Sequence, residues 1–371
     1  MSKVVVEEIN KIELDSKTWW QPELDKKTFK SLTKRDNSKA WFHTILYFSI
    51  LVLSGIIACL TWGTWFAIPA FFIYGTIYAC SNARWHEYGH RSVFKDRKLN
   101  DFFYYISSFL AFFEPISWRW SHANHHSKTR HQDLDLEIAD PRPTNLGVLF
   151  FAEFFGYYRL KAEFTKIIKH SFRIFDKSNQ DDKKIFISDL VPEKEIDKMV
   201  MSSRIFLLII FLTISISFYF NSFLPILLII TPQIYGGPVL WLLAFTQHAG
   251  LKFDSFDHRE TTRTVLLGPI LGTFLYSNHL FYSNNDDFCR LPILTFPKTH
   301  DTANIYYARI RFAGRPESSL GTVSIARSQL RNKIFALVIC MLTSIPTTKR
   351  KMKKKLVKGQ RTMRIKLNER K

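Results

Sequence analysis

The sequence predicts an all-α, polytopic membrane protein with four transmembrane helices arranged as two hairpins. Four apolar runs support this prediction, at residues 41–60, 64–80, 205–220 and 223–245. Each is close to the roughly 20 residues that cross a bilayer as a helix. The short turn TWG separates the first two runs, and NSF separates the last two. A soluble domain has no need of four such runs, so we expect a membrane domain.

The charges around these runs predict their orientation. The first run starts too far along the chain for a secretory signal and lacks a small-residue cleavage pattern, so we interpret it as a membrane anchor. Lys34, Arg35 and Lys39 precede it, whereas neither hairpin turn contains Lys or Arg. By the positive-inside rule, we expect both termini and the long middle segment in the cytosol.

The remaining segments are predicted to lie at or beside the membrane surface. Residues 102–113 are too short to cross, which favours a re-entrant or interfacial helix. Residues 146–158 also suit the interface, and residues 161–203 are expected to form a cytosolic helical loop. The segment 349–371 carries +11 of the net charge of +20. Beside membrane spans, such a tail is expected to lie on anionic lipid or to be disordered rather than to bind nucleic acid.

Histidine spacing predicts a metal site. Six of the 12 histidines lie between residues 86 and 131, in HEYGH and SHANHHSKTRH. On a helix, H-x-x-x-H places two rings on one face a single turn apart, and H-x-x-H-H adds a third ring. The four cysteines, Cys59, Cys80, Cys289 and Cys340, show no paired spacing and are interpreted as apolar filler.

The ligand type and the location together predict the chemistry. An all-imidazole site without cysteine favours iron or another borderline metal over structural zinc. Five rings in the two clusters exceed the needs of one ion, so we expect two. Two ferrous ions can reduce dioxygen to an oxidant able to take hydrogen from an unactivated C–H bond. Lipid is the expected substrate at this location.

The ordered motifs resemble the membrane fatty acid desaturase family. The resemblance runs from about residue 83 to 301 and rests on HEYGHRSVFK with LNDFF, EPISWRWSHANHH, EIADPRP, FTQHAGL and DHRETTRTVLLGPI. It implies four transmembrane helices under a cytosolic helical cap and a histidine-bound di-iron centre. It also implies a fatty acyl lipid substrate and electrons from a cytochrome or ferredoxin partner. We therefore expect a cytosolic segment 1–40, a desaturase-like domain 41–301 and a divergent basic tail 302–371.

Carried over position by position, the resemblance implies a ligand set and four supporting residues. The implied ligands are His86, His90, His122, His125, His126 and His248. The implied supporting residues, which would position ligands rather than bind metal, are Glu87, Asn124, Asp257 and Arg259. The alternative is that these residues have no part in a metal site: Glu87 would be a helix-surface acid, Asn124 a polar spacer, and Asp257 with Arg259 a cytosolic salt bridge.

The chain departs from the family at the third histidine box. The family carries H-x-x-H-H after R-T-V, and the register here places Tyr282, Asn285 and Asp286 at the three ligand positions. A rebuilt site using His279, Tyr282, Asp286 or Asp287 is one interpretation, although oxygen ligands would lower the potential of the iron pair. The other interpretation is that the third histidine box has been lost.

Three functions therefore remain open from the sequence. The first is an active desaturase or hydroxylase with an altered site. The second is a catalytically inactive relative that acts as a membrane partner or regulator. The third is a membrane metal-binding protein with another chemistry.

Overall fold

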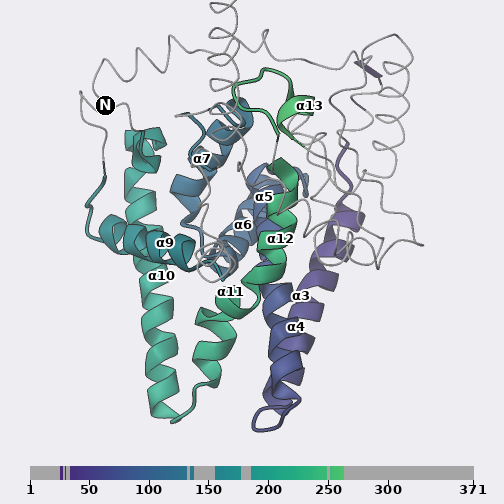
Figure 1. Ribbon diagram of the computed structural model, residues 1–371, viewed down its shortest axis with the longest axis vertical. Coiled ribbons are helices and arrows are strands. Elements are labelled where there is room, and N and C mark those ends of the chain that lie inside the picture. Colours follow the sequence, from purple (N-terminus) through teal and green to yellow (C-terminus); the bar gives the residue numbers. More distant parts are fainter. Residues whose placement is uncertain are drawn as a thin grey trace, which may run out of the picture. The chain divides into compact units, whose positions relative to one another are not determined.

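The computed structural model describes residues 26–27, 30, 34–131, 134–137, 155–176, 185–248 and 251–262, which all fall within one compact unit, residues 1–324. These residues form helices, turns and loops without a strand, which confirms the all-α class (Figure 1). Residues 263–371, including the third-box region and the basic tail, lie outside the described residues.

Two helices are long and apolar enough to cross a membrane, α3 (Asn37–Leu60) and α10 (Glu193–Tyr219). Asp36 caps α3, because its carboxylate accepts the backbone N–H groups of Ser38 and Lys39. Only 33% of the most apolar stretch of α3 and 39% of that of α10 is buried. The rest is apolar side chain at the surface, which water disfavours and lipid tolerates.

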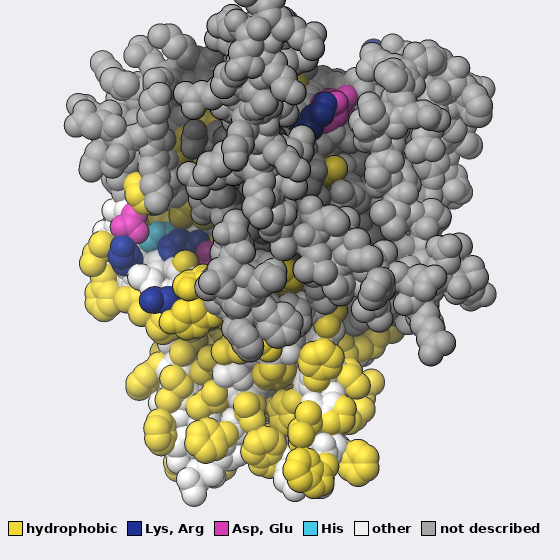
Figure 2. Space-filling model, viewed as in Figure 1, with side chains coloured by type: hydrophobic (Ala, Val, Ile, Leu, Met, Phe, Trp, Pro, Cys, Tyr) yellow, Lys and Arg dark blue, Asp and Glu magenta, His cyan; other side chains and the backbone are white. Residues whose placement is uncertain are grey.

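The two hairpin turns lie at the same end of the described helices (Figure 1). Large apolar side chains cover this end, and no charged side chain is visible on it in Figure 2. The exposed aromatic residues at the turns are Trp62, Trp65, Phe66, Phe218, Tyr219, Phe220 and Phe223. Aromatic side chains gather where a membrane meets water, so this end has the composition of an interface.

The second predicted run folds as a shorter helix that leads straight into the histidine region. α4 (Ala67–Ala79) is followed at once by α5 (Ser81–Gly89), with Cys80 between them. α4 packs along α3, and its buried side includes Phe71, Tyr74 and Tyr78. The first histidine pair is therefore held at the end of a buried helix.

The fourth predicted run is interrupted instead of forming one helix. It consists of the π-helix η3 (Ile226–Ile230), α11 (Pro232–Tyr235) and α12 (Gly237–His248). Proline at positions 225 and 232 removes backbone donors, which favours breaks.

Three tyrosines satisfy the carbonyl groups at this break. The hydroxyls of Tyr235, Tyr74 and Tyr78 donate to the carbonyls of residues 227, 228 and 229 at 2.7, 2.6 and 2.8 Å. Irregular backbone is tolerated at membrane depth only when its polar groups are paired in this way.

Two glycines let the interrupted segment approach α4 closely. A Cβ on Gly236 would lie 1.9 Å from the backbone carbon and oxygen of Gly75. A Cβ on Gly75 would lie 2.2 Å from the ring of Tyr235. The crossing therefore depends on the absence of side chains at both positions, as at other close membrane-helix contacts.

The remaining helices lie outside the four predicted apolar runs. They are α6 (Arg97–Ala111), α7 (Pro115–Ser127), α9 (Tyr157–Ser171), the 3₁₀ helix η2 (Ile187–Leu190) and α13 (His258–Thr261). α6 includes the predicted interfacial segment 102–113 only as far as Ala111, and it is amphipathic, with Asn100 and Tyr104 buried and Phe102 exposed. α10 begins twelve residues before the predicted apolar run 205–220, so the charged first turns of this helix precede the apolar run.

Candidate metal centre

α5 presents the first histidine pair. His86 lies within the helix and His90 caps its end, where its backbone N–H donates to the carbonyl of His86. Their ring centroids are 4.5 Å apart, as expected for residues one turn apart on a helix. His86 is 1% exposed and points into the protein, whereas His90 is half-buried.

α7 presents the second group, and a buried carboxylate fixes its start. Glu114, fully buried, accepts the backbone N–H groups of Ile116 and Ser117 as the N-cap, and the hydroxyl of Ser202 on α10 also donates to it. Burial raises the pKa of the Glu114 carboxyl, although these hydrogen bonds oppose the shift. The cap fixes where α7 begins and therefore which way its histidines point.

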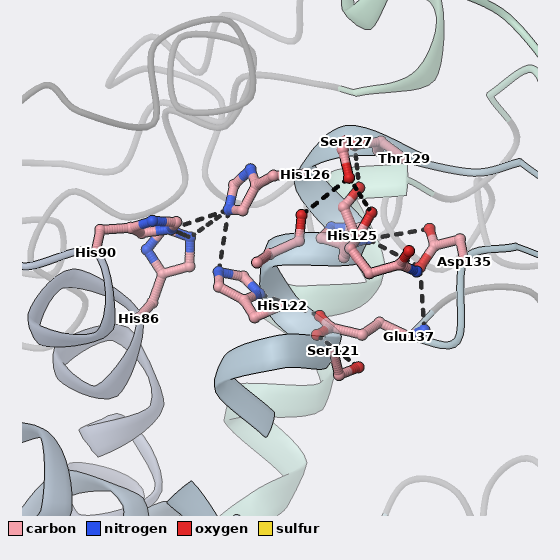
Figure 3. Close-up of polar contacts among 12 residues, drawn as sticks. His86, His90, Ser121, His122, His125, His126, Ser127, Thr129, Asp135 and Glu137 are labelled. Atoms are coloured by element: carbon pink, nitrogen blue, oxygen red, sulfur yellow. Dashed lines mark hydrogen bonds and ion pairs between the residues drawn. The ribbon is translucent and has the colours of Figure 1, made fainter. Parts of the chain in front are cut away.

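Four imidazoles from the two helices converge (Figure 3). The Nε2 atom of His126 is 3.0 Å from those of His90 and His122, and the Nε2 atom of His86 is 3.3 Å from those of His90 and His126. One ligand nitrogen from each of the four lies within 4.8 Å of all the others.

These separations fit one metal ion. Two nitrogens bound to an ion at roughly 2.1 Å lie roughly 3.0 Å apart at a right angle and roughly 3.4 Å apart at the tetrahedral angle. The Nε2 separations fall in this interval. Neutral rings protonated on Nδ1 direct lone pairs at one another here, and a cation between them relieves the repulsion.

Two carboxylates fix the tautomers of His86 and His122. The Nδ1 atom of His86 is 2.8 Å from Oε1 of Glu87, and that of His122 is 3.3 Å from Oε2 of Glu137. Because a carboxylate accepts hydrogen bonds, Nδ1 carries the proton and Nε2 keeps the lone pair that binds metal. Burial raises the pKa of Glu137 to about 7, so the carboxylate form that accepts from His122 prevails above that pH.

His125 belongs to a second, adjacent group. Its Nδ1 atom is 3.0 Å from both carboxylate oxygens of the fully buried Asp135, and its ring centroid is 5.7 Å from that of His248 (Figure 3 shows the Asp135 contact). The Nδ1 atom of His248 donates to the carbonyl of Thr261 at 2.9 Å. Both rings therefore keep Nε2 as the metal-binding nitrogen.

Asp135 is ionised in this setting. Burial alone would raise its pKa, but the interaction with the His125 ring and the backbone N–H groups of Arg130 and Glu137 hold the pKa of this carboxyl below its ordinary value. A negative Asp135 makes the His125 imidazole a stronger ligand.

The predicted supporting residues take different places. Glu87 contacts His86 directly, whereas the Asn124 amide donates to the carbonyl of Leu134 and so holds the loop that carries Asp135. Asp257 accepts the backbone N–H of Glu260 through its carbonyl, and Arg259 lies in α13 with its side chain outside the described part of the chain.

Sequence reasoning missed three residues of the centre. Asp135 and Glu137 contact histidines, and Arg130 donates to the carbonyls of Lys252 and Leu251 at 2.9 Å each, which ties the end of α7 to the loop after α12. The acid-rich stretch after the second histidine cluster was the available signal. The possible replacement ligands His279, Tyr282 and Asp286 lie outside the described residues.

Comparison with known proteins gives one family. The family model described as fatty acid desaturase matches residues 62–282, which is more than half of the chain and includes all six histidines of both groups. Among curated proteins, none is similar enough to count as a match.

Proposed function

Because the chain belongs to the fatty acid desaturase family, we propose that it is a membrane oxidoreductase that desaturates or hydroxylates a fatty acyl chain. The convergence of four imidazoles on one point supports this proposal most strongly. The family uses a di-iron centre, and this donor set suits iron. Bound iron would supply the one-electron chemistry with dioxygen that side chains cannot perform.

The chain's own residues would hold and tune the iron. In this proposal His86, His90, His122 and His126 bind the first ion, and Glu87 and Glu137 orient two of these rings. Buried ligands also exclude water, which strengthens the electrostatic hold on the ion. His125 and His248 would bind a second ion, together with ligands from the region of residues 279–286.

The altered third box supports a second candidate function. With Tyr282, Asn285 and Asp286 at the box positions, the second ion lacks imidazoles there and would be held weakly. The alternative is a relative that keeps the first metal position but no longer activates dioxygen, and acts as a membrane partner or regulator.

The proposed setting is the cytosolic face of a membrane. The candidate spans α3 and α10, with the runs 64–80 and 223–245, would make two hairpins under a cytosolic cap. The domain would span residues 41–301, between a cytosolic segment 1–40 and the tail 302–371. A cytochrome or ferredoxin would deliver electrons from the cytosol.

Iron content and lipid products of the purified, membrane-expressed chain test the proposal. We expect two irons per chain and a new acyl double bond or hydroxyl if the site is rebuilt, and one iron without product if the box is lost. His122→Ala should lower the iron content, whereas His43→Ala, on α3 and outside the cluster, should leave it unchanged. No iron in the natural chain would refute both functions.

The combined variant Tyr282→His, Asn285→His and Asp286→His separates the two functions. If the box is lost, the variant gains iron and gains or increases acyl products, because three imidazoles complete the second position. If the natural chain already turns over lipid and the variant loses that activity, the natural site is rebuilt, and His279, Tyr282 and Asp286 become the ligands to test singly.

A further inference from the structure

A groove of about 640 Å³ lies between α3 and α6, outside the metal centre. Its lining runs from Trp41 to Leu53 on α3, roughly 18 Å along the helix, and includes Phe103 and Ile106 of α6. None of the described residues that line it is charged. Val52 and Leu53 are more than half exposed although α3 is a candidate membrane span. The groove therefore faces the lipid in a membrane-inserted chain.

A basic rim lies at the start of both helices. The backbone N–H of Lys95 donates to Asn37 Oδ1 at 3.0 Å, and Arg35 donates to the carbonyl of Phe94 at 3.5 Å, so the two helix starts are joined. The exposed cations on these starts are Lys34, Lys39, Lys95, Arg97 and Lys98.

The acids at the same place do not neutralise this rim. Asp36 caps α3 and Asp96 caps α6, where each carboxylate accepts backbone N–H groups. Among the described residues, five exposed cations against these two acids leave a net positive rim. Trp41, at the top of the groove, stands edge-on to Phe94 and Phe103, which is a typical place for tryptophan at a membrane interface.

A buried tyrosine separates the groove from the histidines. The hydroxyls of Tyr88 and Thr44 are 2.7 Å apart, and the ring of Tyr88 stacks on Phe103 with centroids 5.4 Å apart. Tyr88 is 2% exposed and lies between His86 and His90 on α5. A chain in the groove therefore meets the back of α5 and not the ring nitrogens that face the metal position.

We propose that this groove binds an anionic phospholipid as a bound, non-reacting lipid, with one acyl chain along α3 and its phosphate at the basic rim. The proposal rests on the membrane insertion proposed above. The apolar walls accept an acyl chain, and the net positive charge of the described rim residues selects a headgroup with net negative charge. A zwitterionic lipid offers the same chain but carries its own cation, so the rim gives it no such advantage.

Fluorescence of Trp41 tests the proposal. The full chain is placed in nanodiscs of phosphatidylcholine that contain a small fraction of either brominated-chain phosphatidylglycerol or brominated-chain phosphatidylcholine. The difference between the natural chain and Trp41→Phe isolates this tryptophan among the nine in the chain. We expect brominated phosphatidylglycerol to quench Trp41 at a lower fraction than brominated phosphatidylcholine does.

Two variants address the two parts of the site. Ser49→Phe fills the groove and should abolish the preference for phosphatidylglycerol. Arg97→Gln with Lys98→Gln should weaken it by roughly fivefold for each charge removed. The matched controls are Ile56→Phe, exposed on α3 outside the groove, and Lys194→Gln on α10, and neither should change the preference.

The outcomes separate the failure of this proposal from the failure of membrane insertion. Equal quenching of Trp41 by both lipids, or a preference that survives Ser49→Phe, overturns the lipid site while leaving insertion intact. Quenching of other tryptophans but not of Trp41 means that another part of the chain covers the groove, which also overturns it. Absence of quenching at every tryptophan refutes insertion itself, and iron content measured on the same preparations reports on the metal centre independently.

Discussion

At the scale of single residues, the centre depends on which nitrogen of each imidazole carries the proton. His86 presents Nε2 to its neighbours because Glu87 accepts the hydrogen bond from Nδ1 at 2.8 Å. The hydroxyl of Ser92 also donates to Glu87, at 3.2 Å, and so holds this carboxylate in place. Removal of the carboxylate frees the ring to rotate and to change tautomer.

We therefore predict that Glu87→Ala lowers metal affinity by roughly 10- to 100-fold without removing a ligand. Titration of the purified chain with Co²⁺, followed through its visible absorption bands, measures this affinity. Glu87→Gln is the control, because its amide oxygen still accepts from Nδ1 and should retain most of the affinity. Equal affinity in the natural chain and in Glu87→Ala would show that Glu87 does not position the ligand.

A second histidine, outside the centre, makes the fold sensitive to acid. His170 on α9 is 3% exposed, and burial, with smaller contributions from Lys166 and Lys169, lowers its pKa to about 4 despite the nearby Asp176. An unfolded chain binds this proton near the ordinary pKa of roughly 6.5. Between these values the unfolded state binds more protons, so stability falls as the pH falls from about 6.5 to about 4.

The predicted consequence is that His170→Gln removes part of the acid sensitivity. Thermal unfolding in detergent at pH 7.5 and pH 5.0 measures it: the drop in midpoint between the two pH values should be smaller in the variant than in the natural chain. The full effect is at most on the order of 3 kcal/mol, since each pKa unit corresponds to about 1.4 kcal/mol. Identical drops in both proteins would contradict this assignment.

The sequence located some residues of the centre and could not locate others, for a physical reason. His86, His90, His122 and His126 follow from helical spacing, and their helices bring them together. His125, at the same spacing, instead turns to Asp135, a choice made by the loop after α7. Helical spacing does not predict which way such a loop turns, so the acid-rich stretch in the sequence did not identify Asp135 and Glu137 as the partners of the histidines.

At the scale of elements, hydrophobic runs predicted where helices occur but not where they break. The run 41–60 became one continuous helix, because it contains no proline. The run 223–245 is also apolar but contains Pro225, Pro232 and Pro238, and tyrosine hydroxyls from α4 accommodate the break. That compensation comes from residues some 150 positions away in the sequence, beyond the reach of local patterns.

The break also depends on the contact between Gly236 and Gly75. We predict that Gly236→Ala destabilises the chain by about 1–3 kcal/mol, because its Cβ would meet backbone atoms of Gly75 that cannot rotate away. Gly237→Ala is a matched control, since a Cβ there meets nothing within 4 Å. The midpoints of thermal unfolding in detergent compare the two variants. Equal midpoints would show that the close contact between α4 and α11 does not contribute to stability.

At the scale of the whole molecule, the described helices have two unlike ends. One end carries both hairpin turns (Figure 1) and exposed aromatic side chains, and the other carries the histidines and the charged first turns of α6 and α10. This polarity agrees with the charge pattern of the sequence, where basic residues precede the first span and neither turn has any. The positive-inside rule would place the histidine end on the cytosolic side of a bilayer and the two turns on the opposite side.

The last prediction is that the histidine end and the turns lie on opposite sides of the membrane. In sealed vesicles with the cytosolic face outward, added protease should remove the segment 349–371, which holds twelve Lys or Arg residues. A membrane-impermeant thiol reagent should label Thr64→Cys, exposed in the first turn, only from the other face, with the natural chain and its four cysteines as the background. Labelling and cleavage from the same face would refute this topology, because two inserted hairpins place an odd number of crossings between each turn and each terminus.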